Sequence, residues 1–509
     1  MASYPQTSII QRPRQTFNDG TCFTPVGLPL IFTVENQKIV ADELRVKYVA
    51  KVFYSDSDTP QTGSSLDLIG VFKTTPNNEG SGVFDMSPIF ANFLSAENTG
   101  VFPVQFDYAS NVTYLQTDRL PIHLIDNYST TQNSIKYFRI QFRTEWLDQT
   151  TNTIVSTGTA VNTDTITVFN GYVKHSEEIT IGAYYSSGAI NPNQGGPLNS
   201  NLGYKVHQFK LDDDTRSLLT NAPLTQQVNI EDYGTMAMLM IRDVYSASNL
   251  TGPYKVKFQG VLNGGSSIAD HNVIIQASNG AYSAIDQGKV SNKMLFFGCG
   301  PANLRRTWSA FSSNIYNMKH YTVKVEDISG NNLSQTYRYD INCFKIDNSN
   351  ISRKKKGYEP IRLCWLNQYG AWDYYTFTMK STRTIKTKGT TFRPLAGQWN
   401  KRIYTPSTFR GGKKTLRVNA REVIKMNTDF IDEENSTWLE ELISSPEIYI
   451  LQGFNTLTDT TILDTTFNQF VTPVRLLTSS HQIKTEANDK LIQYTFEVEK
   501  TKELRTQSV

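Results

Sequence analysis

The sequence is poor in charged residues and has no long apolar run. Charged residues make up 19% of the 509 positions, against about a quarter in an average soluble domain. Hydrophobic residues still make up 39% and aromatic residues 12%, which is enough to build large buried cores and excludes a disordered chain as the default. At about 100–200 residues per domain, this length predicts about three domains.

Cysteine is scarce, and the spacing of the cysteines disfavours both a zinc site and a disulfide framework. The four cysteines form no C-x-x-C pair, so we expect neither a zinc cluster nor a disulfide framework. They are predicted to be reduced, mostly buried thiols: Cys22, Cys299, Cys343 and Cys364. The N-terminus lacks the apolar segment of a secretory signal, and no apolar run approaches the roughly 18 residues of a membrane helix. We therefore expect a chain made in a cytoplasm, with no membrane span.

Signatures of catalysis are also missing. The six histidines form no HExxH motif, and there is no GxSxG elbow, Walker loop or strand-bound GxGxxG. The acidic clusters 212–214 and 56–58 lack the glycine and distal glutamate of an EF-hand loop, which favours solvated turns over calcium sites. We predict a protein that is not an enzyme and holds no metal or cofactor.

Alternating apolar and polar residues recur along the chain. In residues 137–143, Phe138, Ile140 and Phe142 lie on one face and polar residues on the other, which is typical of a strand with one wet side. The same alternation occurs in residues 44–48, 254–258 and 492–498, and residues 320–325 and 336–341 flank a turn-forming tip. The pattern predicts a mainly β fold: several antiparallel β-sandwich domains with a few short inserted helices.

Helix signals and domain boundaries are few. Helices are expected at residues 87–94, with Ser87 as the N-cap, and at residues 435–443, capped by Ser436 or Thr437. Residues 186–200 are rich in turn formers, and residues 347–357 are polar and then basic. We predict an N-terminal β-sandwich region at 1–175 that begins with an extended arm, a middle β-sandwich domain at 176–352, and a C-terminal β-rich domain with a basic segment at 353–509.

Positive charge is concentrated in one segment. From residue 353 to 425 there are 18 Lys and Arg against three acids, a balance of +15, so a total of +3 leaves −12 for the rest of the chain. No acid lies between Asp373 and Glu422. The basic residues of that interval are the predicted interface: Lys380, Arg383, Lys386, Lys388, Arg393, Lys401, Arg402, Arg410, Lys413, Lys414, Arg417 and Arg421.

Three interpretations of the basic segment stay open. It is a long loop that docks on an acidic patch of another subunit, identical copies included, since the rest of the chain is acidic. It is a solvated loop that keeps the protein soluble. Or it binds nucleic acid, with Phe392, Trp399, Tyr404 and Phe409 stacking on bases; no nucleic-acid-binding motif accompanies it, which disfavours this last interpretation.

The most distinctive stretch is 359–377, which predicts a buried strand, a turn at 367–370 and an aromatic return strand. Its pattern W-x-N-x-x-G-x-x-D-Y-Y-T-F runs from Trp365 to Phe377 and resembles one in virion structural proteins of tailed bacteriophages. Residues 80–88 resemble a strand-to-helix turn of the same proteins, and so do residues 438–450, 473–476 and 488–496.

The resemblance implies a tail, baseplate or neck component of a virion, present in several symmetric copies and bound to other virion proteins. Its β-sandwich modules and the basic segment would connect neighbouring subunits. The alternative is a virion-borne adhesin that binds a receptor or glycan, for which Tyr184, Tyr185, Trp308, Trp399 and Tyr404 are candidates by residue type. An enzyme acting on polysaccharide ranks third, because no acid and base residues can be named.

Overall fold

The computed structural model contains two compact units, formed by residues 1–227, 233–341 and 367–373 and by residues 228–232, 342–366 and 374–509. The structure describes residues 4–13, 22–27, 29–55, 67–96, 128–131, 133–172, 184–186, 211–240, 253–275, 293–341, 346–347, 350–351, 358, 360–397, 399, 402–405, 409, 411–451, 471–480 and 492–508. Most of the two predicted linkers lies outside these ranges, so the domain boundaries remain a prediction.

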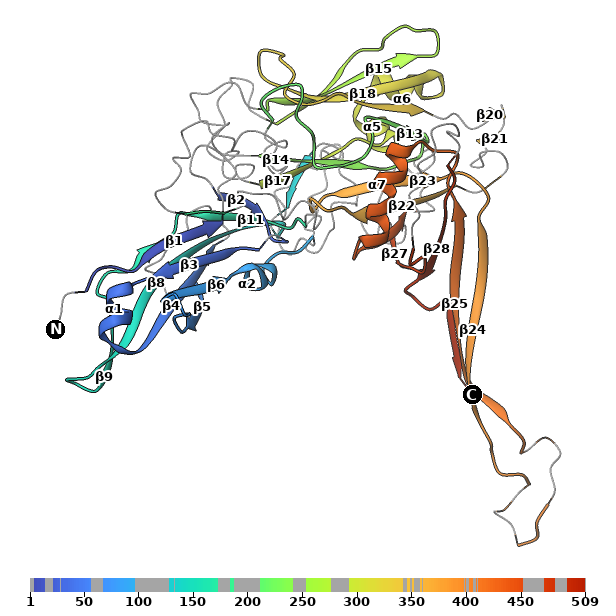
Figure 1. Ribbon diagram of the computed structural model, residues 1–509. Coiled ribbons are helices and arrows are strands. Elements are labelled where there is room, and N and C mark those ends of the chain that lie inside the picture. The colour runs from blue at the N-terminus through green and yellow to red at the C-terminus, as the bar shows by residue number, and fades with distance from the viewer. Residues whose placement is uncertain are drawn as a thin grey trace, which may run out of the picture. The chain divides into compact units, whose positions relative to one another are not determined.

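The fold is mainly β, with several antiparallel sheets and a few short helices (Figure 1), which confirms the predicted class. Among the strand pairs of the described residues, β2 and β11 are the exception, since they run parallel. No helix in the described ranges is both long and apolar enough to cross a membrane.

The first unit begins with two sheets around one core. The core combines Phe32 and Phe84 of the first sheet with Tyr48, Phe138 and Phe142 of the second. The first sheet has the order β12 (Tyr184–Ser186), β1 (Ser8–Pro13), β3 (Ile31–Glu35), β6 (Ser81–Asp85). The second has the order β2 (Cys22–Pro25), β11 (Ile166–Phe169), β8 (Ile135–Asp148), β4 (Leu44–Ser55), β5 (Leu68–Thr74), with β9 (Thr153–Ser156) and β10 (Val161–Asn162) also on β8.

Two sequence predictions for this region need correction. The expected N-terminal arm is part of a sheet, because β1 pairs with β3 and β12, and the Tyr4 hydroxyl donates to Glu43 at 2.6 Å. Helix α2 (Ser87–Ala91) is shorter than expected, and Met86 occupies its N-cap position. Ser87 instead accepts the Leu30 backbone N–H at 2.7 Å. The other helix here, α1 (Gln37–Asp42), is capped by Asn36.

The described part of the first unit also contains two further sheets and three short helices. The predicted hairpin at 320–341 is confirmed as β18 and β19. Tyr321 and Tyr339 stack at 5.1 Å between ring centroids, and Cys299 is a buried free thiol beside them. The smaller sheet has the order β14 (Thr235–Met240), β17 (Lys293–Gly298), β7 (Tyr128–Thr131). The larger sheet has the order β13 (Thr225–Val228), β19 (Tyr337–Ile341), β18 (Met318–Glu326), β15 (Lys255–Leu262), β16 (His271–Ile274). The helices are α5 (Pro301–Thr307), α6 (Ser309–Asn314) and a 3-10 turn (Ile315–Asn317).

The second unit contains an eight-stranded sheet covered by helix α7 (Glu433–Ser444). Trp438 of the helix packs on Trp365 and Tyr375 of the sheet, with ring centroids 5.1 and 6.1 Å apart. The strand order is β23 (Trp372–Phe377), β22 (Ile361–Leu366), β26 (Ile448–Leu451), β27 (Val471–Leu476), β28 (Thr495–Lys500), β25 (Lys414–Asn427), β24 (Thr382–Phe392), with β29 (Arg505–Ser508) also on β25 and a separate pair β20 (Ile346–Asp347) and β21 (Asn350–Ile351).

The cap predicted for α7 was wrong. Asp432 is the N-cap, and its carboxylate accepts the Asn435 backbone N–H at 2.9 Å. Ser436 is buried and bonds to the Tyr494 hydroxyl at 2.6 Å, and Thr437 donates to a backbone oxygen one turn earlier. The helix therefore starts earlier than the sequence predicted. Cys364, in β22, is a second buried free thiol, as expected.

Candidate functional site

The predicted basic segment forms a long β-hairpin, not a loop. Strands β24 and β25 pair antiparallel from Thr382 opposite Lys425 to Phe392 opposite Lys414, with one register shift after Thr390. Nearly every residue of β24 is exposed. Five of its eleven residues are threonines, whose β-branched side chain restricts χ1 and raises the propensity for a strand.

The far part of the hairpin has only two strands. On its other side, β25 pairs with β28 over residues 423–427 and with β29 over residues 417–420. Among the described residues, Lys414 and Thr415 pair only with β24. The hairpin therefore extends past the rest of its sheet as an arm (Figure 1), and we call residues 386–417, including the connecting loop, the distal hairpin.

Ion pairs hold the base of the hairpin. The buried Glu422 carboxylate accepts from Arg383 at 3.0 Å and contacts the Lys500 ammonium at 2.7 Å. Burial alone would raise the pKa of Glu422, but these two cations outweigh it and hold the pKa below its ordinary value. Glu499 lies between Arg421 at 2.9 Å and Arg475 at 3.1 Å, and chiefly its hydrogen bond with Arg421 lowers its pKa.

The predicted interface residues divide into groups. Arg383, Arg417 and Arg421 are ion-paired within the chain, the second only weakly, at 4.0 Å from Glu503. The remaining described ones lie before β24, on the two strands or in the connecting loop: Lys380, Lys386, Lys388, Arg393, Arg402, Lys413 and Lys414. Lys401 and Arg410 lie outside the described residues.

Charge on the distal hairpin is entirely of one sign. Residues 386–417 contain nine Lys and Arg and no Asp or Glu. The Lys414 ammonium donates to the Phe409 carbonyl at 2.8 Å. Within the described ranges, the ion pair of Arg417 with Glu503 is the only one made by a residue of this segment. The distal hairpin is thus a cationic surface with little compensation inside the chain.

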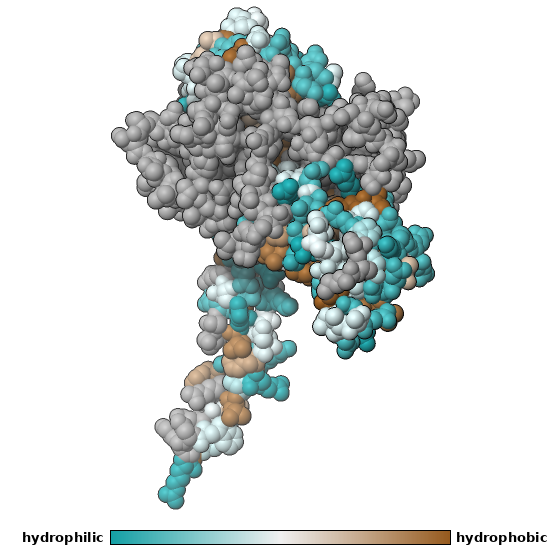
Figure 2. Space-filling view, turned by 90° about the vertical axis from the view of Figure 1, so that its left-hand side faces the viewer, coloured by the Kyte–Doolittle hydropathy of each residue, from teal (hydrophilic) through white to brown (hydrophobic). Residues whose placement is uncertain are grey.

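Large apolar side chains are exposed on the same loop. Their exposed fractions run from 50% to 78%, in the order Tyr404, Trp399, Phe409, Ile403, Leu395. The Trp399 and Tyr404 rings lie 5.0 Å apart. In the space-filling view, apolar (brown) and polar (teal) residues are interspersed along the arm, the lowest part of the picture (Figure 2). Trp399, Tyr404 and Phe409 were expected from the sequence as stacking residues, whereas Leu395 and Ile403 were not predicted.

The adhesin alternative loses one candidate. Trp308 is buried, stacked between His271 and Phe311, and its indole N–H donates to the Ala269 carbonyl at 2.7 Å. It is therefore part of a core and not available to a glycan. The side chains of Tyr184 and Tyr185 lie outside the described residues, which leaves Trp399 and Tyr404 as exposed aromatic residues.

In the turn of the W-x-N-x-x-G-x-x-D motif, the polar residues have structural roles. The Asn367 side chain accepts the backbone N–H groups of Tyr369 and Ala371 and donates to Asp373 at 3.1 Å. Gly370 has a φ of +76°, and a Cβ there would lie 2.0 Å from the Asn170 carbonyl oxygen. Only glycine fits this position.

The two strands that flank the turn, β22 and β23, help to hold a buried ion pair in the second unit. Arg362 lies 3.1 Å from Asp232, and Thr376 of the motif donates to the same carboxylate at 2.8 Å. The Arg362 guanidinium also lies over the Tyr374 ring, 5.1 Å from its centroid. The motif residues Tyr374 and Thr376 therefore stabilise the fold, and no ligand is needed to explain them.

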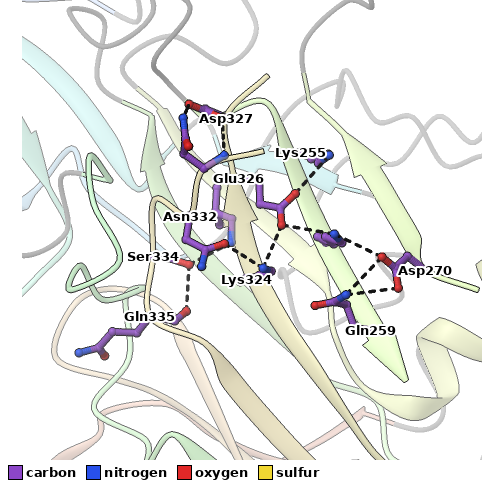
Figure 3. Close-up of polar contacts among 12 residues, drawn as sticks. Lys255, Gln259, Asp270, Lys324, Glu326, Asp327, Asn332, Ser334 and Gln335 are labelled. Carbon is purple, nitrogen blue, oxygen red and sulfur yellow. Dashed lines mark hydrogen bonds and ion pairs between the residues drawn. The ribbon is translucent and has the colours of Figure 1, made fainter. Parts of the chain in front are cut away.

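A second charged cluster lies on the sheet of β15 and β18 in the first unit (Figure 3). The buried Glu326 carboxylate contacts Lys324 at 3.0 Å, Lys255 at 3.2 Å and Lys257 at 3.5 Å, and Asp270 contacts Lys257 at 3.3 Å. Burial alone would raise the pKa of Glu326, but the lysines outweigh it and lower the pKa. Because every charged group of this cluster contacts one of opposite sign, the cluster ties strands together and is a weaker candidate site than the hairpin.

Residues 212–214, considered above for calcium, form a turn in which Arg216 contacts Asp212 at 2.5 Å and Asp213 at 3.3 Å. In the described part of the chain, no group of three or more His, Cys, Asp or Glu residues is arranged to hold a metal ion. In comparisons with known proteins, no family model and no curated protein matches this chain.

Proposed function

We propose that the protein is a structural component of a tailed-phage virion, in the tail, baseplate or neck, and that its hairpin connects it to neighbouring subunits. The observation that carries the proposal is the distal hairpin itself: nine cations, no acid, and five large apolar side chains at least half exposed. The resemblance of residues 359–377 to virion structural proteins is the reason for proposing that the assembly is a virion.

The combination of charge and apolar surface favours a protein partner. A hairpin that only kept the chain soluble would gain nothing from exposing Leu395 and Ile403, because exposed apolar clusters promote association. Nucleic-acid stacking uses flat rings, and these two aliphatic side chains offer none. A neighbouring subunit with an acidic surface around an apolar depression satisfies both features at once.

One observation favours the alternative function of a glycan-binding adhesin. The Trp399 and Tyr404 rings are exposed and lie 5.0 Å apart, and aromatic faces of this kind suit sugar rings. An adhesin would bind host cells or glycans as the isolated protein, whereas a connector would not, and a glycan array separates the two functions.

Charge reversal of the hairpin tests the connecting role. The variant Lys388→Glu, Arg402→Glu, Lys413→Glu changes exposed residues of the distal hairpin, so it should fold normally and fail to enter particles. The matched control reverses three exposed lysines elsewhere: Lys47→Glu, Lys319→Glu, Lys502→Glu. Copy number in purified particles and the melting temperature of the free chain are measured for both. Normal incorporation of the hairpin variant would contradict the proposal.

A further inference from the structure

The second unit also carries an acidic segment that contains no basic residue. Between Met426 and Val474 the sequence has no Lys or Arg. The described acids of this segment lie just before α7, on it and just after it: Asp429, Asp432, Glu433, Glu434, Glu440, Glu441 and Glu447. Asp432, Glu433 and Glu434 are exposed. Phe430, beside them, is 53% exposed, so this segment too combines charge with an apolar side chain.

Strand β25 separates the two charged regions. It begins at Lys414, at the distal hairpin, and ends at Asn427, two residues before Asp429. Fourteen residues at about 3.4 Å each span about 45 Å. The Debye length at physiological salt is about 8 Å. The acids at one end of β25 therefore cannot neutralise the cations at the other end of the same molecule.

Between these ends, the cations of the sheet are ion-paired within the chain. Lys425, Arg421 and Arg383 are paired with Glu497, Glu499 and Glu422 respectively, at 2.9–3.4 Å. The cations in the middle of the sheet are thus engaged by carboxylates of the same chain, whereas the distal hairpin makes a single ion pair within the described ranges, that of Arg417. The ends have opposite sign, and each presents exposed apolar surface.

We propose that the distal hairpin of one copy docks on the acidic start of α7, residues 429–434, in a second copy of this chain. The inference rests on the proposed function, in which the hairpin is the docking element, and it names the partner. Because donor and acceptor are different surfaces, the contact is head-to-tail, and repetition generates a ring or an open filament according to the angle between successive copies.

Self-association of the full chain tests the inference by sedimentation velocity. The wild-type chain should form oligomers at low salt and dissociate at about 1 M salt, where the Debye length falls to about 3 Å. The hairpin variant Lys388→Glu, Arg402→Glu, Lys413→Glu and the helix variant Glu433→Lys, Glu434→Lys should each weaken self-association by about tenfold or more. Lys47→Glu, Lys319→Glu, Lys502→Glu is the matched control and should associate like wild type.

Mixing the two variants gives the sharpest readout. The first keeps a native acidic segment and the second a native hairpin, so an equimolar mixture should form the contact that neither variant forms alone. Melting temperatures show that both variants are folded. Restored association in the mixture supports the docking pair; no association, with both variants folded, overturns it.

The outcomes also separate the inference from the proposed function. If the wild-type chain stays monomeric at low salt while the hairpin variant fails to enter particles, the partner is a different acidic subunit: the inference is overturned and the proposed function stands. If the hairpin variant enters particles normally, the proposed function fails. Hairpin-dependent binding of the monomeric chain to anionic vesicles or to nucleic acid would likewise overturn the inference.

Discussion

Replacing Glu422 by glutamine should loosen the base of the hairpin. Its carboxylate is buried and holds Arg383 and Lys500 at 3.0 and 2.7 Å. A hydrogen bond to a charged group contributes about 1.5–3 kcal/mol, but the Arg383 side chain is 37% exposed, so solvent screening reduces its share. Glutamine retains one acceptor oxygen. We expect the free energy of unfolding of the second unit to fall by about 2 kcal/mol.

The assay is denaturant unfolding of the full chain, followed by hydrogen exchange of the backbone amides of β24 and β25. Exchange should accelerate in both strands, because Glu422 joins β25 to the strands on either side. The matched control is Arg417→Gln, whose 4.0 Å pair with Glu503 is exposed and should contribute less than about 0.5 kcal/mol. If the two variants have equal stability and equal exchange, the ion-pair argument is refuted.

The same variant has a defined pH dependence. The pKa of Glu422 is lowered in the folded chain from an ordinary value of 4.5. The ionised carboxylate therefore contributes stability that is fully present above pH 4.5 and is lost as the pH falls through the folded pKa. The stability difference between wild type and Glu422→Gln should be constant near pH 7 and shrink below pH 4.5.

Two more outcomes are expected. Gly370→Ala should lower the free energy of unfolding by about 3 kcal/mol or more. The left-handed backbone is strained for alanine, and the new Cβ would lie 2.0 Å from the Asn170 carbonyl oxygen. The control in thermal unfolding is Gly412→Ala, which has a φ of +74° and open space around it and should lose only the backbone-strain part. The double variant Trp399→Ala, Ile403→Ala should keep the melting temperature of wild type, because both side chains are exposed, and should enter particles less well. Equal incorporation in a competition with wild type would show that these two side chains have no docking role.

Strands with one buried face could be predicted from the sequence, and the hairpin could not. In β8, Phe138, Ile140 and Phe142 are fully buried, and the alternation that this burial requires is visible in the sequence. In β24 neither face is buried, so no apolar period exists to be found. The threonines were the available signal, but the charged and glycine residues between them resemble a loop.

The predicted helix starts were wrong for a different reason. Asp432, Ser436 and Thr437 are all chemically able to cap a helix, and the choice between them is made by tertiary contacts. Ser436 is engaged by the Tyr494 hydroxyl, 58 residues away in sequence. The basic segment at one end of β25 was predicted from the composition, whereas the acidic segment at the other end was not, and their separation along a single strand follows from the fold.

The strand order of the second unit has a consequence for a chain cut within the hairpin loop. Cleavage there leaves β22, β23 and β24 on the first fragment and β25 to β29 on the second. In the sheet, the strands of the second fragment lie between β22 on one side and β24 on the other. A protease nick at the loop should therefore split the polypeptide without separating its pieces, and the two fragments, expressed separately, should assemble by complementation. We accordingly expect the loop to tolerate a tag or an inserted domain without loss of the fold.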